Sequence, residues 1–138
     1  MPKFEDLTVG DVVAQQDYKI TRDSLVRYAG ASGDFNTIHY RDDIAQAVGL
    51  PGVLAHGMLT MGISIQPVVS WVGDAGRVVD YGVRFTKPVV VPPHGHAALS
   101  VTATIGALEV EAKRVRVDLT TVFEENTVLG KAQAWVQF

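Results

Sequence analysis

The chain of 138 residues contains no cysteine. This absence excludes disulfide bonds, thiol nucleophiles and thiolate metal sites together. It also fits the reducing cytoplasm, where we expect the protein to work. The length suits one domain with its own hydrophobic core, and no repeat or linker-like segment divides the sequence. We therefore expect residues 1–138 to form a single domain.

The chain also lacks a basic cluster and a long apolar segment. Its formal net charge is −3, and its 12 lysines and arginines are scattered. Nucleic-acid-binding domains carry a basic stripe, so we expect no nucleic-acid partner. The N-terminus has no apolar stretch behind basic residues and does not resemble a secretory signal. The most hydrophobic run, 57–73, is shorter than the roughly 20 apolar residues that cross a bilayer. We expect a buried helix there and no membrane association.

The first part of the chain has the patterns of helices. One helix is predicted to begin after Thr21, a good N-cap, and to end at Gly30 and Gly33. A second, short helix is predicted within residues 40–50, with an apolar face formed by Ile44, Ala47 and Val48. A third helix, 57–72, is apolar on almost every side, which is typical of a completely buried helix. Pro67 predicts a kink or an early end of this helix.

After Gly76 the pattern changes to that of strands. Segments 77–91, 97–108, 113–125 and 127–138 are rich in β-branched residues or alternate between apolar and polar. The clearest alternation places one set of residues on a single face, namely Val115, Val117, Leu119, Thr121 and Phe123. These features predict an α+β domain in which three or four antiparallel strands wrap one long central helix. Because the helix is so apolar and the sheet so small, we expect a second subunit to complete its cover.

A loop between the first two predicted helices carries residues that can take part in proton transfer. The sequence GASGDFNTIHY places Asp34, Asn36 and His39 close together where neither helix nor strand is indicated. Histidine has an ordinary pKa of about 6.5, so it can donate or accept protons near neutrality, and a neighbouring carboxylate can assist it. Alternatively, Asp34 caps a turn and His39 packs as an ordinary histidine. The spacing leaves both readings open.

A second candidate lies at the start of the long helix. Gly57 follows His56, and a glycine there lets a ligand approach the backbone. The first N–H groups of a helix have no partner within the helix, and the helix dipole favours negative charge at that end. An oxyanion could therefore bind at Gly57. The alternative is that Gly57 serves only close helix packing.

Three segments together resemble one protein family. GDFNTIH resembles the hydratase 2 motif, D-x-N-P-[IL]-H, AHGML resembles its companion motif, and YGVRFTKPV resembles the strand that follows. On these segments, in this order, the chain resembles the family of MaoC-like hotdog-fold dehydratases and (R)-specific enoyl hydratases. Within that family, SGDFNTIHY, GVLAHGMLTMG and SWVGDAG are similar to the catalytic B subunits of mycobacterial-type (3R)-hydroxyacyl-acyl-carrier-protein dehydratases. Thr37 stands where the motif usually has proline, which removes no catalytic atom.

The resemblance implies a hotdog fold and a hydro-lyase of fatty-acid metabolism. Such an enzyme interconverts a (3R)-3-hydroxyacyl thioester, carried on ACP or CoA, with the trans-2-enoyl thioester and water. It implies that Asp34 and His39 form the catalytic pair, that Gly57 N–H binds the thioester oxygen, and that Asn36 holds the loop or orients the pair. No metal or cofactor is implied. The partner would be a second copy of the chain or a related hotdog subunit.

A hotdog thioesterase and a non-catalytic acyl-binding subunit are the alternative functions. A hotdog thioesterase would need a carboxylate on the helix 57–72, which has none, and a non-catalytic acyl-binding subunit would lack the Asp34–His39 pair. We expect His94 and His96 to lie in a solvated loop rather than to bind metal. The cations Arg77, Arg84 and Lys87 could meet the substrate phosphate or an acidic carrier, or form an ordinary solvated face.

Overall fold

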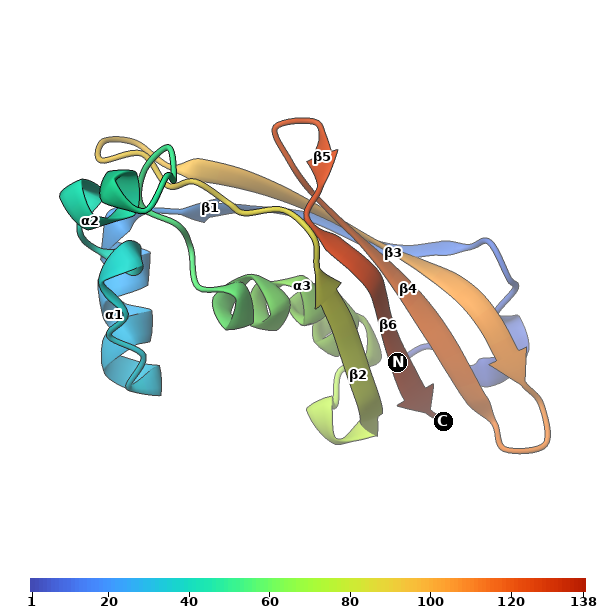
Figure 1. Ribbon diagram of the computed structural model, residues 1–138. Coiled ribbons are helices and arrows are strands. Elements are labelled where there is room, and N and C mark those ends of the chain that lie inside the picture. The colour runs from blue at the N-terminus through green and yellow to red at the C-terminus, as the bar shows by residue number, and fades with distance from the viewer.

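A computed structural model describes residues 1–138 and consists of one antiparallel sheet with a long helix against it (Figure 1). The helices are α1 (Arg22–Ser32), α2 (Asp42–Ala47) and α3 (Gly57–Val72), with short 3-10 turns η1 (Phe4–Asp6), η2 (Thr37–His39) and η3 (Ala75–Arg77). The strands are β1 (Val12–Ile20), β2 (Val78–Phe85), β3 (Ala97–Glu109), β4 (Arg114–Phe123), β5 (Asn126–Thr127) and β6 (Leu129–Gln137). None of the helices combines the length and the hydrophobicity needed to cross a membrane.

The sheet has the order β1-β3-β4-β6-β2, and the short β5 pairs with β4. Every pairing is antiparallel. Helix α3 lies across one face of this sheet and contacts β1, β2, β3 and β4, while α1 and α2 lie beyond its first turn (Figure 1). The expected arrangement, an antiparallel sheet around one long helix, is confirmed.

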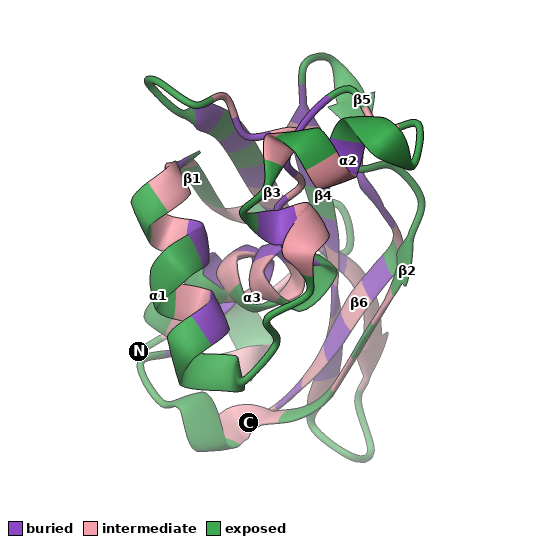
Figure 2. Cartoon of the chain, turned by 60° about the vertical axis from the view of Figure 1, so that its left-hand side comes forward, coloured by how far each residue is buried: buried purple, intermediate pink, exposed green.

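The hydrophobic core lies between α3 and the sheet. The alternation predicted for β4 is confirmed, because Val115, Val117, Leu119, Thr121 and Phe123 are all buried. Strand β6 alternates in the same way, as Figure 2 shows. Side chains at every second position of a strand point to the same face, so the inner face of the sheet is apolar and the outer face is polar.

Strand β1 was not predicted, and the sheet has six strands rather than three or four. It pairs with β3 from Val12 opposite Thr104 to Ile20 opposite Ala97. Its central residues Gln15, Gln16 and Asp17 are exposed, so its sequence lacks the apolar alternation of a core strand. An edge strand pairs on one side only and tolerates such polar residues.

The bounds predicted for α3 are confirmed, but its complete burial is wrong for the single chain. One face is buried, whereas Met58 is 58% exposed and the other apolar positions are only partly covered. Of the predicted kink or early end at Pro67, the early end is wrong. A proline removes one N–H donor, but later residues continue the bonding up to the cap, where Gly73 N–H donates to Val69 O at 3.0 Å. Gly73 takes the left-handed conformation that ends the helix.

The shorter helices agree in part with the sequence prediction. Thr21 caps α1 as predicted and forms a capping box with Ser24. Gly33, with a φ of 77°, ends this helix, whereas Gly30 lies inside it. In α2 the buried residue is Ala45, while the predicted face residues Ala47 and Val48 are exposed. With six residues, α2 has fewer than two turns, so its apolar spacing does not define a buried face.

Candidate active site

Two segments, 33–41 and 53–57, meet at the start of α3. The second segment is held by a short antiparallel bridge, in which Ala55 N donates to Val89 O at 2.8 Å and Val91 N donates to Val53 O at 2.9 Å. The first segment joins it through Leu54 N, which donates to Ile38 O at 3.1 Å. These backbone bonds place His39 beside Leu54 and close to the first turn of α3.

His39 has a defined proton arrangement. Its Nδ1 lies 2.7 Å from the carbonyl oxygen of Leu54, and the ring is largely buried. A carbonyl oxygen only accepts hydrogen bonds, so Nδ1 carries the proton and the neutral ring keeps its lone pair on Nε2. Nε2 has no hydrogen-bond partner in the chain. It is therefore the atom of His39 that can accept a proton.

Asp34 and Asn36 hold the loop in front of His39. Asp34 Oδ1 accepts from Asn36 N at 3.1 Å, and Asn36 Oδ1 accepts from Ile38 N at 3.2 Å, so each side chain caps a turn. Asp34 is exposed, yet possible ligand atoms of Asp34, His39 and His56 lie within 4.8 Å of one another. The structure thus brings Asp34 and His39 together. Asp34 also caps a turn, as the alternative interpretation of the sequence predicts.

His56 lies between these two residues and is only 1% exposed. Its Nε2 donates to the backbone oxygen of Asp34 at 3.1 Å, and its ring stacks on that of His39 with centroids 3.8 Å apart and an interplanar angle of 22°. Tyr28 packs edge-on against its ring, while Nδ1 is buried without a partner. Burial lowers the pKa of His56, and the neighbouring His39 adds to this effect. His56 is therefore neutral near pH 7.

The N-terminal end of α3 offers free donors. Leu59 N and Thr60 N donate to His56 O at 3.1 and 3.2 Å, whereas Gly57 N–H and Met58 N–H have no acceptor in the chain. A Cβ atom on Gly57 would lie 3.0 Å from two ring carbons of Phe85. The ring of Phe85 thus approaches Gly57 closely, and the backbone of Gly57 does not have the left-handed conformation that favours glycine.

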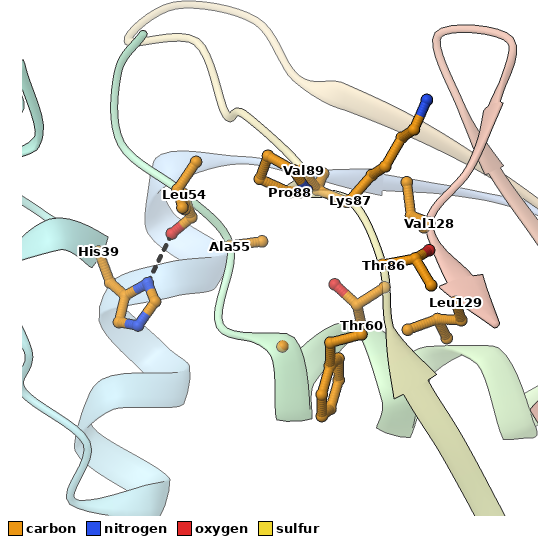
Figure 3. Close-up of a pocket in the computed structure, with 12 residues that line it drawn as sticks. His39, Leu54, Ala55, Thr60, Thr86, Lys87, Pro88, Val89, Val128 and Leu129 are labelled. Atoms are coloured by element: carbon orange, nitrogen blue, oxygen red, sulfur yellow. Dashed lines mark hydrogen bonds between the residues drawn. The ribbon is translucent and has the colours of Figure 1, made fainter. Parts of the chain in front are cut away.

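A pocket of about 350 Å³ connects His39 with Gly57 (Figure 3). Its wall is mostly apolar and comes from the bridge, the first turn of α3 and the segments around the ends of β2 and β5. The lining residues are His39, Leu54, Ala55, Gly57, Thr60, Phe85, Thr86, Lys87, Pro88, Val89, Val128 and Leu129. Asp34 and Asn36 stand outside this wall. The chain thus places a free imidazole nitrogen and a helix N-terminus on one cavity, which suits proton transfer next to a developing oxyanion.

The cluster of Asp34, His39 and His56 has the residue types of a metal site, but its geometry suits a hydrogen-bonded network better. The two imidazole rings are stacked, so their lone pairs do not converge on one point between them. His39 Nδ1 and His56 Nε2 are also occupied by backbone oxygens. His94 and His96, the other candidate pair, are both exposed in a loop, as expected.

Of Arg77, Arg84 and Lys87, Lys87 alone lines the pocket. Its Nζ donates to Asn126 Oδ1 at 2.8 Å, and Figure 3 shows its side chain directed away from His39. Arg77 lies over the ring of Phe138, 5.7 Å from its centroid. Arg84 lines a separate groove with Lys131 and Trp135. The structure therefore does not gather these cations at one phosphate site.

The family model for the MaoC like domain matches residues 4–123. The chain is 30% identical over 135 residues to an (R)-specific enoyl-CoA hydratase from Rhodospirillum rubrum, which covers 96% of this chain and 90% of that protein. It is 40% identical over 74 residues to the 3-hydroxyacyl-thioester dehydratase X of Mycobacterium tuberculosis, which covers 54% of this chain and 25% of that protein.

A solved structure described as a MaoC-like dehydratase superposes with a TM-score of 0.95 at 36% identity, and covers 99% of this chain and 42% of that chain. This likeness confirms the expected hotdog fold. The chain accordingly spans less than half the length of that solved protein and about a quarter of the mycobacterial relative.

Proposed function

The chain belongs to the family of MaoC-like domains, and from that membership we propose that it is a hydro-lyase acting on acyl thioesters. It interconverts a (3R)-3-hydroxyacyl thioester with the trans-2-enoyl thioester and water, as the catalytic subunit of a fatty-acid elongation enzyme. The thioester is carried on ACP or CoA. The names of the two relatives, a 3-hydroxyacyl-thioester dehydratase and an (R)-specific enoyl-CoA hydratase, support this substrate class.

The observation that carries the proposal is that His39, whose Nε2 has no partner, and Gly57, whose N–H has no acceptor, line one pocket. Dehydration removes a proton from C2, beside the thioester carbonyl, and expels the hydroxyl group from C3. Hydroxide leaves poorly unless it is protonated, so the reaction needs an acid as well as a base. A neutral imidazole with its lone pair on Nε2 provides a base, and the neighbouring Asp34 provides a second group for proton transfer.

The proton balance is closed within the pair. One member takes the C2 proton, and the C2–H electron pair forms the double bond as the C3–O bond breaks. The other member, which starts the cycle protonated, gives its proton to the departing oxygen to form water. Transfer of the gained proton between the two members then restores the starting state. The hydration reaction runs through the same steps in reverse. We assign Asp34 and His39 jointly, because two coupled groups titrate as a pair. Asn36 contributes by holding the loop in its turn.

Negative charge develops on the thioester oxygen as the C2 proton leaves. The N–H groups of Gly57 and Met58 have no acceptor within the chain and point out of the positive end of α3. Removing one donor from an oxyanion hole typically costs about 3–4 kcal/mol of barrier. The oxyanion interaction therefore matters as much as the proton-transfer pair.

The same proposal includes a second hotdog subunit over the site, either another copy or a related chain. Three large apolar side chains on segments that carry the site, Phe35, Met58 and Phe85, are each more than half exposed. Strand β2 is an edge of the sheet with one unpaired side, so a second sheet can continue it. A cover there would exclude water from Asp34 and strengthen its interactions with the substrate.

Two rival functions receive less support. Helix α3 carries no carboxylate, which a hotdog thioesterase would need for its nucleophile or water activation. A non-catalytic acyl-binding subunit needs no free imidazole nitrogen on its pocket, whereas His39 presents one. Neither rival explains why an acid, a histidine and a helix N-terminus meet at one place.

The direct test offers the purified chain crotonyl-CoA and a longer enoyl thioester and follows loss of the enoyl absorbance. Asp34→Asn and His39→Ala should each abolish turnover while the thermal unfolding midpoint stays close to that of the unchanged protein. His96→Ala, in an exposed loop, serves as the control. If both site variants stayed active, the proposal would be wrong. If the unchanged chain were inactive alone but active when co-expressed with a second hotdog subunit, the missing cover would be the cause.

A further inference from the structure

We infer that His56 is the positioning residue of this site: its imidazole fixes the backbone of Asp34 and the ring of His39, and its backbone sets the position of Gly57 N–H. The inference rests on the proposed function for the roles of those three residues. Three separate contacts support it, and each joins His56 to a different part of the site.

The first contact anchors the Asp34 loop. His56 Nε2 donates to Asp34 O over 3.1 Å, across a separation of 22 residues in the chain. The other hydrogen bonds of Asp34 go to Ser32 and Asn36, inside the same turn. The His56 bond is thus the one hydrogen bond that fixes Asp34 relative to the rest of the fold. Without it, the turn could keep its shape and still move as a unit away from His39.

The second contact fixes the ring of His39. Its Nδ1–H bond to Leu54 O holds one edge, at 2.7 Å, and the His56 ring covers one face at a centroid distance of 3.8 Å. Rotation of the His39 ring by half a turn would break the bond to Leu54 and move Nε2 away from its present direction. The bond to Leu54 O and the stacked His56 ring together therefore fix the direction of the Nε2 lone pair.

The third contact is covalent. His56 is the N-cap of α3, and its carbonyl accepts from Leu59 N and Thr60 N. Gly57 is the next residue, so the plane of the His56–Gly57 peptide sets the direction of the Gly57 N–H bond. His56 therefore joins the Asp34 loop and the His39 ring, through its side chain, to the start of α3, through its backbone.

His56 itself is not a catalytic residue. It is 1% exposed and does not line the pocket. Its Nε2–H is used by Asp34 O, and its Nδ1 is enclosed without a partner. The ionisable groups around it are Asp34 and His39, with the ring of Tyr28 at 4.7 Å between centroids. Burial keeps its pKa below the ordinary value, so it stays a neutral donor and acts through its neighbours.

Two variants separate the hydrogen bond from the ring contact. His56→Phe keeps a flat ring over His39 and removes the donor to Asp34. His56→Gln replaces the ring and keeps an amide N–H near the position of Nε2. Misplacing reacting groups by about 1 Å costs on the order of 100-fold in rate. We expect His56→Phe to lower kcat by that amount with little change in KM, and His56→Gln to recover part of it. His96→Gln is the control, because it removes an exposed histidine that does not line the site pocket.

A second readout needs no activity. The ¹⁵N chemical shifts of His39 report which ring nitrogen carries the proton. The unchanged protein should show the proton on Nδ1, and His56→Gln, which removes the stacked ring, should show a mixture of both forms. Both variants should unfold cooperatively, and if His56→Phe does not fold, His56→Gln decides the question on both readouts.

Unchanged kcat in the folded variants, with unchanged His39 shifts, would overturn the inference. A general loss of stability with normal kcat in the folded fraction would do the same. If the unchanged protein had no hydratase activity with or without a second subunit, the proposed function would fail, while the His39 shifts would still test whether His56 controls the ring.

Discussion

Replacing Gly57 with alanine should separate the oxyanion role of this residue from simple helix packing. The new Cβ would lie 3.0 Å from Cδ1 and Cε1 of Phe85, whereas ordinary contacts begin at 3.4 Å. The difference, 3.4 minus 3.0 Å, requires Phe85 to retreat by about 0.4 Å. Phe85 is more than half exposed, so its ring can move at small cost. Alanine also favours the helix by up to about 1 kcal/mol, so the stability should change little.

The activity should respond much more strongly. The added methyl group lies beside the N–H donor, on the wall of the pocket where the thioester oxygen has to approach to hydrogen-bond distance. Loss of one oxyanion donor typically lowers kcat by about 100-fold to 1000-fold, which corresponds to about 3–4 kcal/mol of barrier. We expect a loss in that range for Gly57→Ala, measured as initial rates of enoyl thioester hydration together with a thermal unfolding curve.

Gly62→Ala provides a matched control on the same helix. Gly62 is exposed, and a Cβ there would have nothing within 4 Å. It should raise the free energy of unfolding by up to about 1 kcal/mol and leave kcat unchanged. The reasoning would be refuted if Gly57→Ala kept near-normal kcat, or if both variants lost activity equally. The second result would indicate that α3 tolerates no added methyl group at all.

Two further predictions concern the groups that hold the site segments. The guanidinium of Arg22 donates to both oxygens of Asp42, at 2.8 and 3.0 Å, and its Nε donates to Val91 O at 2.9 Å. Arg22→Ala should therefore lower the free energy of unfolding by about 1–2 kcal/mol, measured by urea titration. Arg22 lowers the pKa of Asp42 below its ordinary value of about 3.9, so the pair stabilises the fold fully above that pH. The difference between variant and unchanged protein should therefore shrink as the pH falls below 3.9, and a constant difference would contradict this. Ser64 Oγ donates to Thr60 O and contacts the buried Thr121 hydroxyl, each at 2.8 Å. Ser64→Ala should therefore lower the free energy of unfolding by about 1–3 kcal/mol in the same titration. An unchanged free energy of unfolding would exclude a structural role for this hydroxyl.

The elements with long, regular patterns could be predicted from the sequence. The buried face of β4 follows a period of two over five inward residues, and the bounds 57–72 of α3 follow from a long apolar run between glycines. Strand β1 could not be predicted, because pairing with β3, not its own polar sequence, makes residues 12–20 a strand. The buried face of α3 also depends on where the sheet lies, which no local pattern specifies.

In the site, too, the sequence predicts what lies within one segment but not the contacts between segments far apart in the chain. The motif placed Asp34 and His39 on one loop, and their closeness in the structure agrees with that expectation. The contact of His56 with Asp34 joins residues 22 positions apart, and Phe85 reaches Gly57 only because β2 passes the start of α3. The available signal was a histidine directly before the glycine, and nothing in the sequence indicated its burial or which partner it would bind.

The two candidate catalytic residues differ in burial, and this difference leaves the site of the single chain open to solvent. His39 is sheltered between Leu54 and His56, whereas Asp34, only a few ångströms away, faces solvent. In water an exposed carboxylate keeps its hydration, and its interaction with a substrate is weak. The proposed proton transfer therefore needs a surface that covers Asp34. The exposed apolar side chains Phe35 and Met58 adjoin Asp34 and Gly57 in the chain, where such a surface would have to pack. Assembly and catalysis should consequently be coupled: substitutions that weaken subunit contact at Phe35 should lower kcat even though Phe35 does not line the pocket.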